Sequence, residues 1–153
     1  MDRQATLRME LQRVLGGQRY LVLATESGGQ PYANLMAFAV SDDLCFLTLL
    51  TDRRTRKFAS LTANRRVALF LDDRENVGTD TRDALAVTAI GEAEEVAGSE
   101  AARLRAAFAA RHPTLADFAQ APDCAVLRVR VGVYRVVSHF EEVREWYPGA
   151  AGQ

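Results

Sequence analysis

Cysteine and histidine are scarce in this sequence, with only two of each in 153 residues. Cys45 and Cys124 stand in apolar runs, a setting typical of buried, reduced thiols, and no Cys/His spacing of a zinc site is present. His112 and His139 have no cysteine or carboxylate partner at metal-ligand spacing, and no Ser/His/Asp or Cys/His catalytic set stands out. The sequence therefore predicts no disulfide, no metal centre and no recognisable side-chain nucleophile.

Long hydrophobic runs and an excess of one charge are also lacking. No stretch approaches the roughly 18 apolar residues that a membrane span needs. The first 15 residues carry charges throughout and lack the apolar block of a signal peptide, so we expect a cytoplasmic protein. The chain has 19 basic and 20 acidic residues, a balance that argues against nucleic-acid binding. Its length suits one domain, expected over 1–148, with a disordered tail over 149–153.

Hydrophobic periodicity gives the expected elements in order. Helices are predicted over 4–15, from Thr51 to about Asn64 and over 99–112 with Ser99 as its cap, and a helical turn at 115–119. Strands are predicted over 20–25, 32–40, 44–50, 66–71, 84–96 and 125–137, with a polar loop over 72–83. We expect the first three strands to form an antiparallel meander, Gly91 to mark a bulge, and Val129, Val131 and Val133 to share one face. The segment 140–147 is ambiguous.

These runs of strands and helices do not alternate as βαβ units. That order favours a mainly β fold, an antiparallel barrel of about six or more strands with helices packed outside.

A basic segment, Thr51–Lys57, is the most informative stretch. It follows a strand that reads as buried, and it places four cations at the start of a helix for which Thr51 is a plausible N-cap. A helix N-terminus is partially positive, so cations there are unfavourable unless an anion lies among them. Backbone N–H groups, hydroxyls and cations at one helix start suit a phosphate. The alternative is a solvated basic turn.

The order of these motifs resembles the FMN-binding split-barrel family, the fold of pyridoxamine 5′-phosphate oxidase and its relatives. The resemblance rests on Leu-Ala-Thr-Glu-Ser-Gly-Gly-Gln-Pro-Tyr at 23–32, Leu-Met-Ala-Phe-Ala-Val at 35–40, Thr-Arg-Lys-Phe within 47–61 and Ala-Asn-Arg-Arg-Val-Ala-Leu at 63–69. It implies a homodimer that holds FMN at its interface and exchanges hydride or electrons between the flavin and a small organic substrate. The fold it implies is a split β-barrel.

The same resemblance implies a set of cofactor-binding residues. Arg56 and Lys57 would hold the phosphate, with Thr51 and Thr55 as hydroxyl donors. Met36, Ala37, Phe38 and Leu49 would border the ring and ribityl chain, although core packing explains Met36 and Phe38 equally well. Asn76 would make a polar contact, and Trp146 would reach the flavin from the partner chain or simply cover the barrel.

Two departures from the family pattern limit what the resemblance implies. Ala59-Ser60-Leu61 and Asn64-Arg65-Arg66 replace the usual Asn and Asn-Pro-Arg. No C-terminal Arg-x-His pair is present, since the tail has Arg144-Glu145-Trp146, and vitamin B6 oxidation is therefore not expected. The alternatives are a non-catalytic flavin or haem binder, a deazaflavin-dependent reductase, and a structural barrel without a cofactor.

Overall fold

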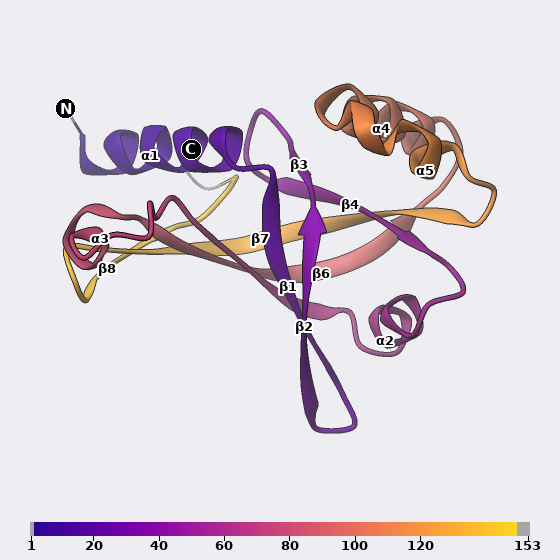
Figure 1. The fold of residues 1–153 in the computed structure, drawn as a ribbon, viewed down its shortest axis with the longest axis horizontal. Helices are drawn as coiled ribbons and strands as arrows, with labels where there is room; N and C mark the ends of the chain where they lie inside the picture. The colour runs from indigo at the N-terminus through magenta and orange to yellow at the C-terminus, as the bar shows by residue number, and fades with distance from the viewer. Residues whose placement is uncertain (1, 150–153) are drawn as a thin grey trace.

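The computed structural model describes residues 2–149, which form one curved antiparallel sheet with helices against it (Figure 1). Within this range the elements follow one another along the chain. They are α1 (Arg3–Gly17), β1 (Tyr20–Ser27), β2 (Gln30–Ala37), β3 (Ala39–Val40), β4 (Phe46–Asp52), α2 (Arg56–Ala63), β5 (Arg66–Asp72), α3 (Asp80–Asp83), β6 (Ala86–Val96), α4 (Gly98–Arg111), a 3₁₀ turn (Pro113–Leu115), α5 (Ala116–Gln120), β7 (Cys124–Ser138) and β8 (Glu142–Trp146). Apart from Gly149, the expected disordered tail lies outside the described residues.

The sheet order explains how the barrel closes. Strands run in the order β2-β1-β5-β6-β7-β4-β3, and β8 pairs with β7. β2 and β3 lie at the two ends of this order, yet only Phe38 separates them in the chain. The sheet therefore curls so that its two ends meet at Phe38, which is fully buried. This confirms the predicted mainly β split barrel with flanking helices.

The expected meander of three strands is confirmed only in part, because the segment 32–40 pairs antiparallel with both neighbouring strands but does so as two separate strands. β1 pairs with β2, and β3 pairs with β4, but β2 and β4 are not paired. Instead β4 pairs with the distant β7, from Phe46↔Arg130 to Asp52↔Cys124. The single strand expected over 32–40 is likewise interrupted at Phe38. Sequence proximity favours local pairing, but closing the curved sheet requires the chain to leave β2 and join the opposite edge.

A bulge changes which side chains of β7 face the core. The pairing of β6 with β7 passes from Ile90↔Val133 to Gly91↔Val131, which leaves Gly132 as an extra residue. An extra residue reverses the two-residue alternation of a strand. Val129 and Val131 are buried as predicted, but beyond the bulge Tyr134 and Val136 point inward in place of Val133. The irregularity expected at Gly91 is confirmed.

The core consists of two clusters of buried apolar side chains. The larger fills the barrel, where α1 contributes Leu7, Leu11, Val14 and Leu15. The smaller lies beneath α4 and α5 and includes Leu50, Phe108 and Ala119.

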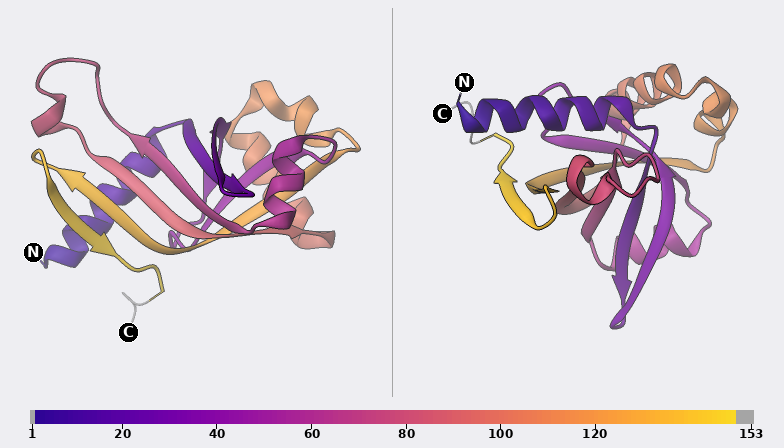
Figure 2. Two further views of the ribbon diagram at one scale, coloured as in Figure 1. Left: turned by 90° about the horizontal axis from the view of Figure 1, so that it is seen from below. Right: turned by 60° about the vertical axis from the view of Figure 1, so that its left-hand side comes forward.

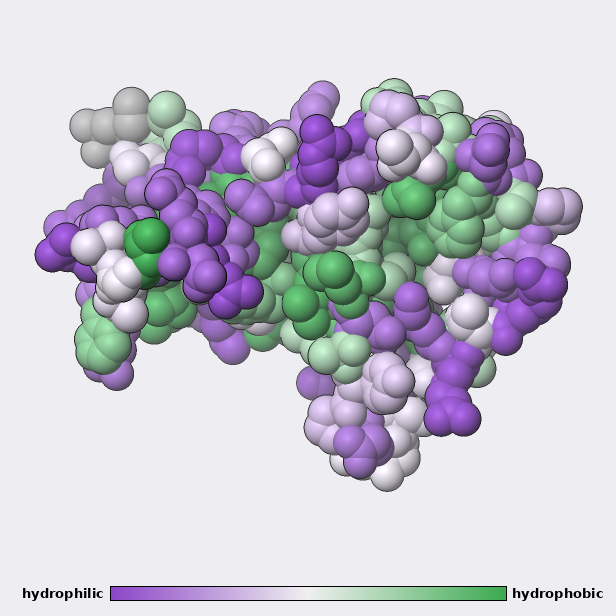
Figure 3. Space-filling model, in the orientation of Figure 1, coloured by the Kyte–Doolittle hydropathy of each residue, from purple (hydrophilic) through white to green (hydrophobic). Residues whose placement is uncertain are grey.

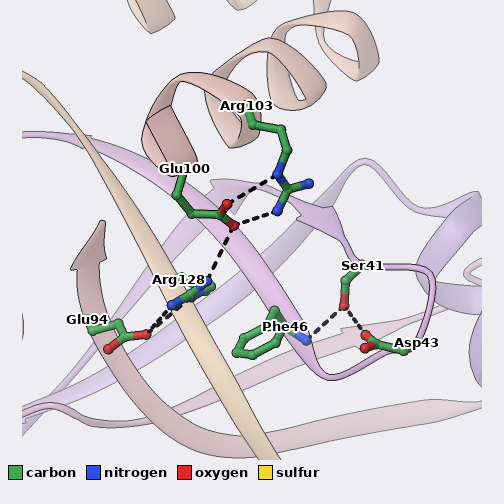
Figure 4. Close-up of polar contacts among 7 residues, drawn as sticks. All are labelled: Ser41, Asp43, Phe46, Glu94, Glu100, Arg103 and Arg128. Carbon is green, nitrogen blue, oxygen red and sulfur yellow. Dashed lines mark hydrogen bonds and ion pairs between the residues drawn. The ribbon is translucent and has the colours of Figure 1, made fainter. Parts of the chain in front are cut away.

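A chain of charges also ties α4 to the sheet (Figure 4). Arg128 on β7 contacts Glu94 of β6 at 2.8 Å and Glu100 of α4 at 3.5 Å, and Glu100 in turn pairs with Arg103. These ion pairs therefore hold the start of α4 against β6 and β7.

Several predicted boundaries need correction. α2 begins at Arg56 with Thr55 as its N-cap, not at Thr51, because β4 continues through Asp52. α4 begins at Gly98 after Ala97, and Ser99 is not its cap. The polar loop over 72–83 contains the short helix α3, and the ambiguous segment 140–147 contributes β8.

Candidate functional site

Two threonine hydroxyls converge where β4 passes into α2. The Oγ1 atom of Thr55 accepts a hydrogen bond from the Phe58 N–H at 3.2 Å and donates to the Asp52 carbonyl at 2.8 Å. Thr51, only 2% exposed, places its Oγ1 3.4 Å from that of Thr55. The start of α2 thus combines a capped helix terminus with paired hydroxyls.

The four cations of the basic segment fall into two classes. Arg54 pairs with Asp52 at 2.7 Å and lowers the pKa of that carboxyl to about 2. Arg53 pairs with Glu95 across to β6. Within residues 2–149, Arg56 and Lys57 have no ion-pair partner. The structure therefore neutralises the first two arginines and leaves the next two cations available to an external anion.

Lys57 occupies the less exposed of these two positions. Its Nζ lies 3.1 Å from the Met36 sulfur on β2, and burial lowers the pKa of its ammonium group. Lys57 is also the only lysine in the sequence, since every other basic residue is arginine. A partly buried cation without a counter-charge is unfavourable, so this position suits a ligand that supplies the missing negative charge.

A polar cavity of about 470 Å³ opens between α2 and the β1–β2 hairpin. The hairpin extends away from the sheet beside α2 (Figures 1 and 2). Apart from Arg56 and Lys57, the lining is uncharged and polar or aromatic. It comprises Thr25, Ser27, Gln30, Tyr32, Asn34, Thr55, Arg56, Lys57 and Ser60. The amide nitrogen of Asn34 is buried and lacks a hydrogen-bond partner within the described chain, which marks an unused donor at this cavity.

A second, mainly apolar pocket of about 330 Å³ lies on the other side of Lys57. β2, the end of β4 and the α4–α5 helices form its walls. Its lining comprises Leu35, Met36, Ala37, Leu50, Thr51, Asp52, Thr55, Lys57, Phe108, Leu115 and Phe118. Thr55 and Lys57 line both spaces. We call these two adjoining spaces the groove; polar residues line its hairpin end, mainly apolar residues line its α5 end, and Lys57 lies between them.

The groove brings together six of the ten predicted cofactor-binding residues. These are Met36, Ala37, Thr51, Thr55, Arg56 and Lys57. Phe38 and Leu49 are fully buried in the barrel core, because Phe38 occupies the closure and Leu49 points inward from β4. Neither residue lines the groove.

Asn76 and Trp146 also lie away from the groove. Asn76 stands between β5 and α3, and α3 and α2 occupy opposite ends of the sheet (Figures 1 and 2). Trp146 is 2% exposed and packs against Tyr134 at a ring-centroid distance of 6.2 Å. Trp146 is buried because β8 folds back onto β7 and its last residue points into the barrel. Of the two readings of Trp146, the structure favours a cover for the barrel.

Sequence reasoning missed the hairpin and helix residues of the groove. Residues 26–31 looked like a turn, yet Ser27 and Gln30 are paired residues at the hairpin's end. The sequence does contain a signal for this strand, because polar residues alternate with less polar ones along β2. The polar positions are Gln30, Tyr32 and Asn34, and the positions between them are Pro31, Ala33 and Leu35. Phe108, Leu115 and Phe118 gave no such signal, since their approach to β2 depends on how α4 and α5 pack.

Neither histidine lines the groove, although the His112 ring packs against Phe108 at a centroid distance of 4.8 Å. The His112 ring nitrogen Nε2 lies 2.7 Å from the Phe38 carbonyl oxygen in a buried contact. His139 is exposed in the β7–β8 turn with a φ of 47°. Among the described residues no group of three or more His, Cys, Asp or Glu side chains is placed to hold a metal ion. No helix within 2–149 is long and apolar enough to cross a membrane.

The fold is a split barrel with a groove beside the edge strand β2. A family model for pyridoxamine 5′-phosphate oxidase matches residues 7–138. The chain therefore belongs to the pyridoxamine 5′-phosphate oxidase family. A search of the curated proteins finds no match.

Solved structures with the same fold have diverse descriptions. General Stress Protein 26 from Bacillus anthracis has a TM-score of 0.73 at 19% identity, covering 92% of this chain and 98% of that one. A FAD-binding protein from Mesorhizobium loti has a TM-score of 0.66 at 23% identity, covering 83% and 89%. A haem-binding protein from Mycobacterium smegmatis has a TM-score of 0.76 at 20% identity, covering 89% of this chain and only 56% of that one. At these identities the likeness shows the fold alone.

Proposed function

We propose that this protein is a flavin-dependent oxidoreductase that acts on a small organic substrate as a homodimer. The observation that carries the proposal is the unneutralised pair Arg56 and Lys57, placed between a polar cavity and an apolar pocket. A flavin mononucleotide unit has the matching order of parts: a phosphate, a polar ribityl chain and a flat aromatic ring.

The residues of the groove fit such a ligand. Arg56 can hold a phosphate through two N–H groups and Lys57 supplies a point charge, while the Thr55 hydroxyl and the start of α2 add donors. The buried amide of Asn34 supplies one more. Met36, Ala37 and Leu35 give an apolar edge against which a ring packs. A bound flavin itself exchanges hydride or electrons with a substrate, so the chain's own task is binding, orientation and exclusion of water.

A second copy of the chain would complete this site. Leu35 borders the apolar pocket and is 71% exposed, and across the sheet it aligns with Val22 and with the 40%-exposed Phe70. Figure 3 shows hydrophobic side chains gathered over β1 and β2 on this face. Exposed apolar surface of this kind marks an interaction site. A partner seated there would bury the patch and close the open side of the groove.

The direct test is a flavin titration with a matched control. Arg56→Ala combined with Lys57→Ala should weaken FMN binding by about 2–5 kcal/mol, or roughly 30- to 4,000-fold. Arg53→Ala combined with Arg54→Ala removes the same formal charge from the same segment but only cations that already have carboxylate partners. It should leave FMN affinity nearly unchanged. Wild-type protein without affinity for FMN below millimolar concentration would end the proposal.

Haem binding is the second candidate, because one protein with this fold is described as haem-binding. It would require an axial ligand, and neither histidine lines the groove. A haem titration that gives a Soret band lost in His139→Ala would favour this candidate. A parallel titration with a deazaflavin tests the remaining alternative, in which a deazaflavin and not FMN is the coenzyme.

A further inference from the structure

The polar cavity is larger than a phosphate site requires. Its volume of about 470 Å³ falls within the roughly 300–1,000 Å³ typical of pockets that take a whole small molecule. A single phosphate beside Arg56 and Lys57 would occupy only the part next to α2. The remainder continues along the inner face of the β1–β2 hairpin, away from the apolar pocket.

This remaining space is uncharged. Alternate residues of the paired strands point into it, with Thr25 opposite Tyr32 and Ser27 opposite Gln30. Thr25 is only 5% exposed, and its hydroxyl makes no hydrogen bond to another side chain or backbone group within residues 2–149. The Gln30 amide nitrogen donates to the Pro31 carbonyl at 2.9 Å, which leaves its side-chain oxygen free to accept. The space therefore offers hydroxyls and an amide oxygen but no further cation.

An aromatic ring stands at the rim of the same space. Tyr32 is 59% exposed, although it lies on the face of β2 that also carries the buried Met36. Aromatic side chains of this kind stack with nucleobases regardless of base identity. Hydroxyl and amide groups beside a stacking ring are the groups that bind a ribose and the polar edge of a base.

The hairpin is held in place before any ligand binds. The Asn64 amide nitrogen, directly after α2, donates to the Glu26 carboxylate at 2.7 Å and contacts the Glu26 carbonyl at 3.3 Å. Gly28 and Gly29 form the tip with φ values of 57° and 85°, which glycine adopts without strain. Because α2 and the hairpin are tied together at this end, the walls of the cavity are preformed.

We propose that the hairpin half of the groove is a nucleoside subsite and that the native cofactor is the dinucleotide FAD. The pyrophosphate would lie at Thr55, Arg56 and Lys57, whose two unpaired cations match its two negative charges. The adenosine would extend along the hairpin and stack on Tyr32. This inference rests on the proposed flavin function. A deazaflavin tail rich in carboxylates fits less well, because the hairpin half supplies no cations.

The test compares the affinities of the intact protein for FAD, FMN and ADP by fluorescence and calorimetric titration. FAD should bind at least tenfold more tightly than FMN, and ADP should compete with FAD but not with riboflavin. Tyr32→Ala should weaken FAD binding about 5- to 150-fold through loss of base stacking and leave FMN affinity unchanged. Tyr32→Phe keeps the ring and should keep the preference for FAD. Tyr147→Ala, at an exposed tyrosine outside the groove, is the control.

The outcomes separate this inference from the proposed function. If FMN binds as tightly as FAD and Tyr32→Ala changes neither affinity, the nucleoside subsite is refuted while the flavin function stands. Tighter binding of an oligoglutamyl deazaflavin than of FAD would also refute it. If none of these coenzymes binds, the proposed function itself fails. Unchanged FMN affinity in Tyr32→Ala shows that the variant is folded.

Discussion

Replacing Lys57 by methionine distinguishes two effects of the lysine charge: its effect on the stability of the ligand-free protein and its effect on flavin affinity. Lys57 is partly buried, its Nζ lies against the Met36 sulfur, and no carboxylate within the described chain pairs with it. Methionine keeps the length of the stem and removes the charge. We therefore expect Lys57→Met to make the ligand-free protein more stable and its flavin binding weaker.

The size of both effects follows from the environment of the side chain. Relief of an uncompensated, partly buried charge should raise the free energy of unfolding by about 0.5–2 kcal/mol. For a chain of this length that corresponds to an increase in Tm of about 1–8 °C. Loss of a charged contact to a phosphate should cost about 1.5–3 kcal/mol of binding, or roughly 10- to 150-fold in Kd.

The pH dependence of stability gives an independent check. Burial lowers the pKa of Lys57 in the folded protein, so the unfolded chain holds this proton more tightly. The charged Lys57 ammonium group therefore destabilises the folded protein. This destabilisation is fully present below the lowered pKa, and it disappears as the pH rises from there towards the ordinary pKa of lysine. The stability difference between wild type and Lys57→Met should therefore shrink between pH 7 and about pH 10. Carbon-13 labelling of lysine gives one side-chain signal to follow, because the sequence has one lysine.

The matched control is Arg56→Met, which removes an exposed charge from the neighbouring position. It should weaken flavin binding without raising the Tm of the ligand-free protein. A lower Tm for ligand-free Lys57→Met, or a lysine signal that titrates at the ordinary pKa, would refute the burial argument. Unchanged flavin affinity in Lys57→Met would remove lysine from the proposed phosphate site.

Two further predictions concern the scaffold. Gly91→Ala should lower the free energy of unfolding, measured by urea titration, by more than about 2 kcal/mol, because its Cβ would lie 2.1 Å from the Arg130 carbonyl oxygen. Gly16→Ala is the control and should not destabilise the protein in this way, because the space around the added atom is open. Equal stabilities of the two variants would contradict the close approach at the bulge. Hydrogen bonds from Ser41 and Cys45 lower the pKa of Asp43, so its stabilising contribution is present above the ordinary carboxyl pKa and is lost as pH falls through the lowered value. Asp43→Asn should accordingly flatten the acid limb of the stability curve, and an unchanged limb would show that this turn does not contribute to it.

Much of the scaffold was predictable from local patterns. Alternation and turn residues placed most strands of the barrel, and the 3.6-residue period placed α1 and α4 to within two residues, whereas α2 begins five residues later than predicted. The strand pairings were not predictable in the same way. β4 pairs with β7, about 80 residues further along the chain, and this long-range contact leaves no local signal in either strand.

The same division holds for the groove. The sequence by itself determined that a basic segment follows a buried strand, and hence that Arg56 and Lys57 stand at a helix start suited to an anion. It contains equally basic Arg53 and Arg54. Arg54 has a local partner, because Asp52 lies only two residues before it. The partner of Arg53 depends on the tertiary structure, because folding brings Glu95 of β6 to it.

Only the tertiary structure decided what surrounds the two free cations. A strand alternates its side chains between two faces, but the packing of α2 against the β1–β2 hairpin decides which face lines a cavity. The same packing placed Tyr32 and Asn34 beside Lys57. The pairing of β4 and β8 with β7 buried Leu49 and Trp146 in the core. Charge and periodicity are properties of a short segment, whereas a binding groove depends on how distant segments meet.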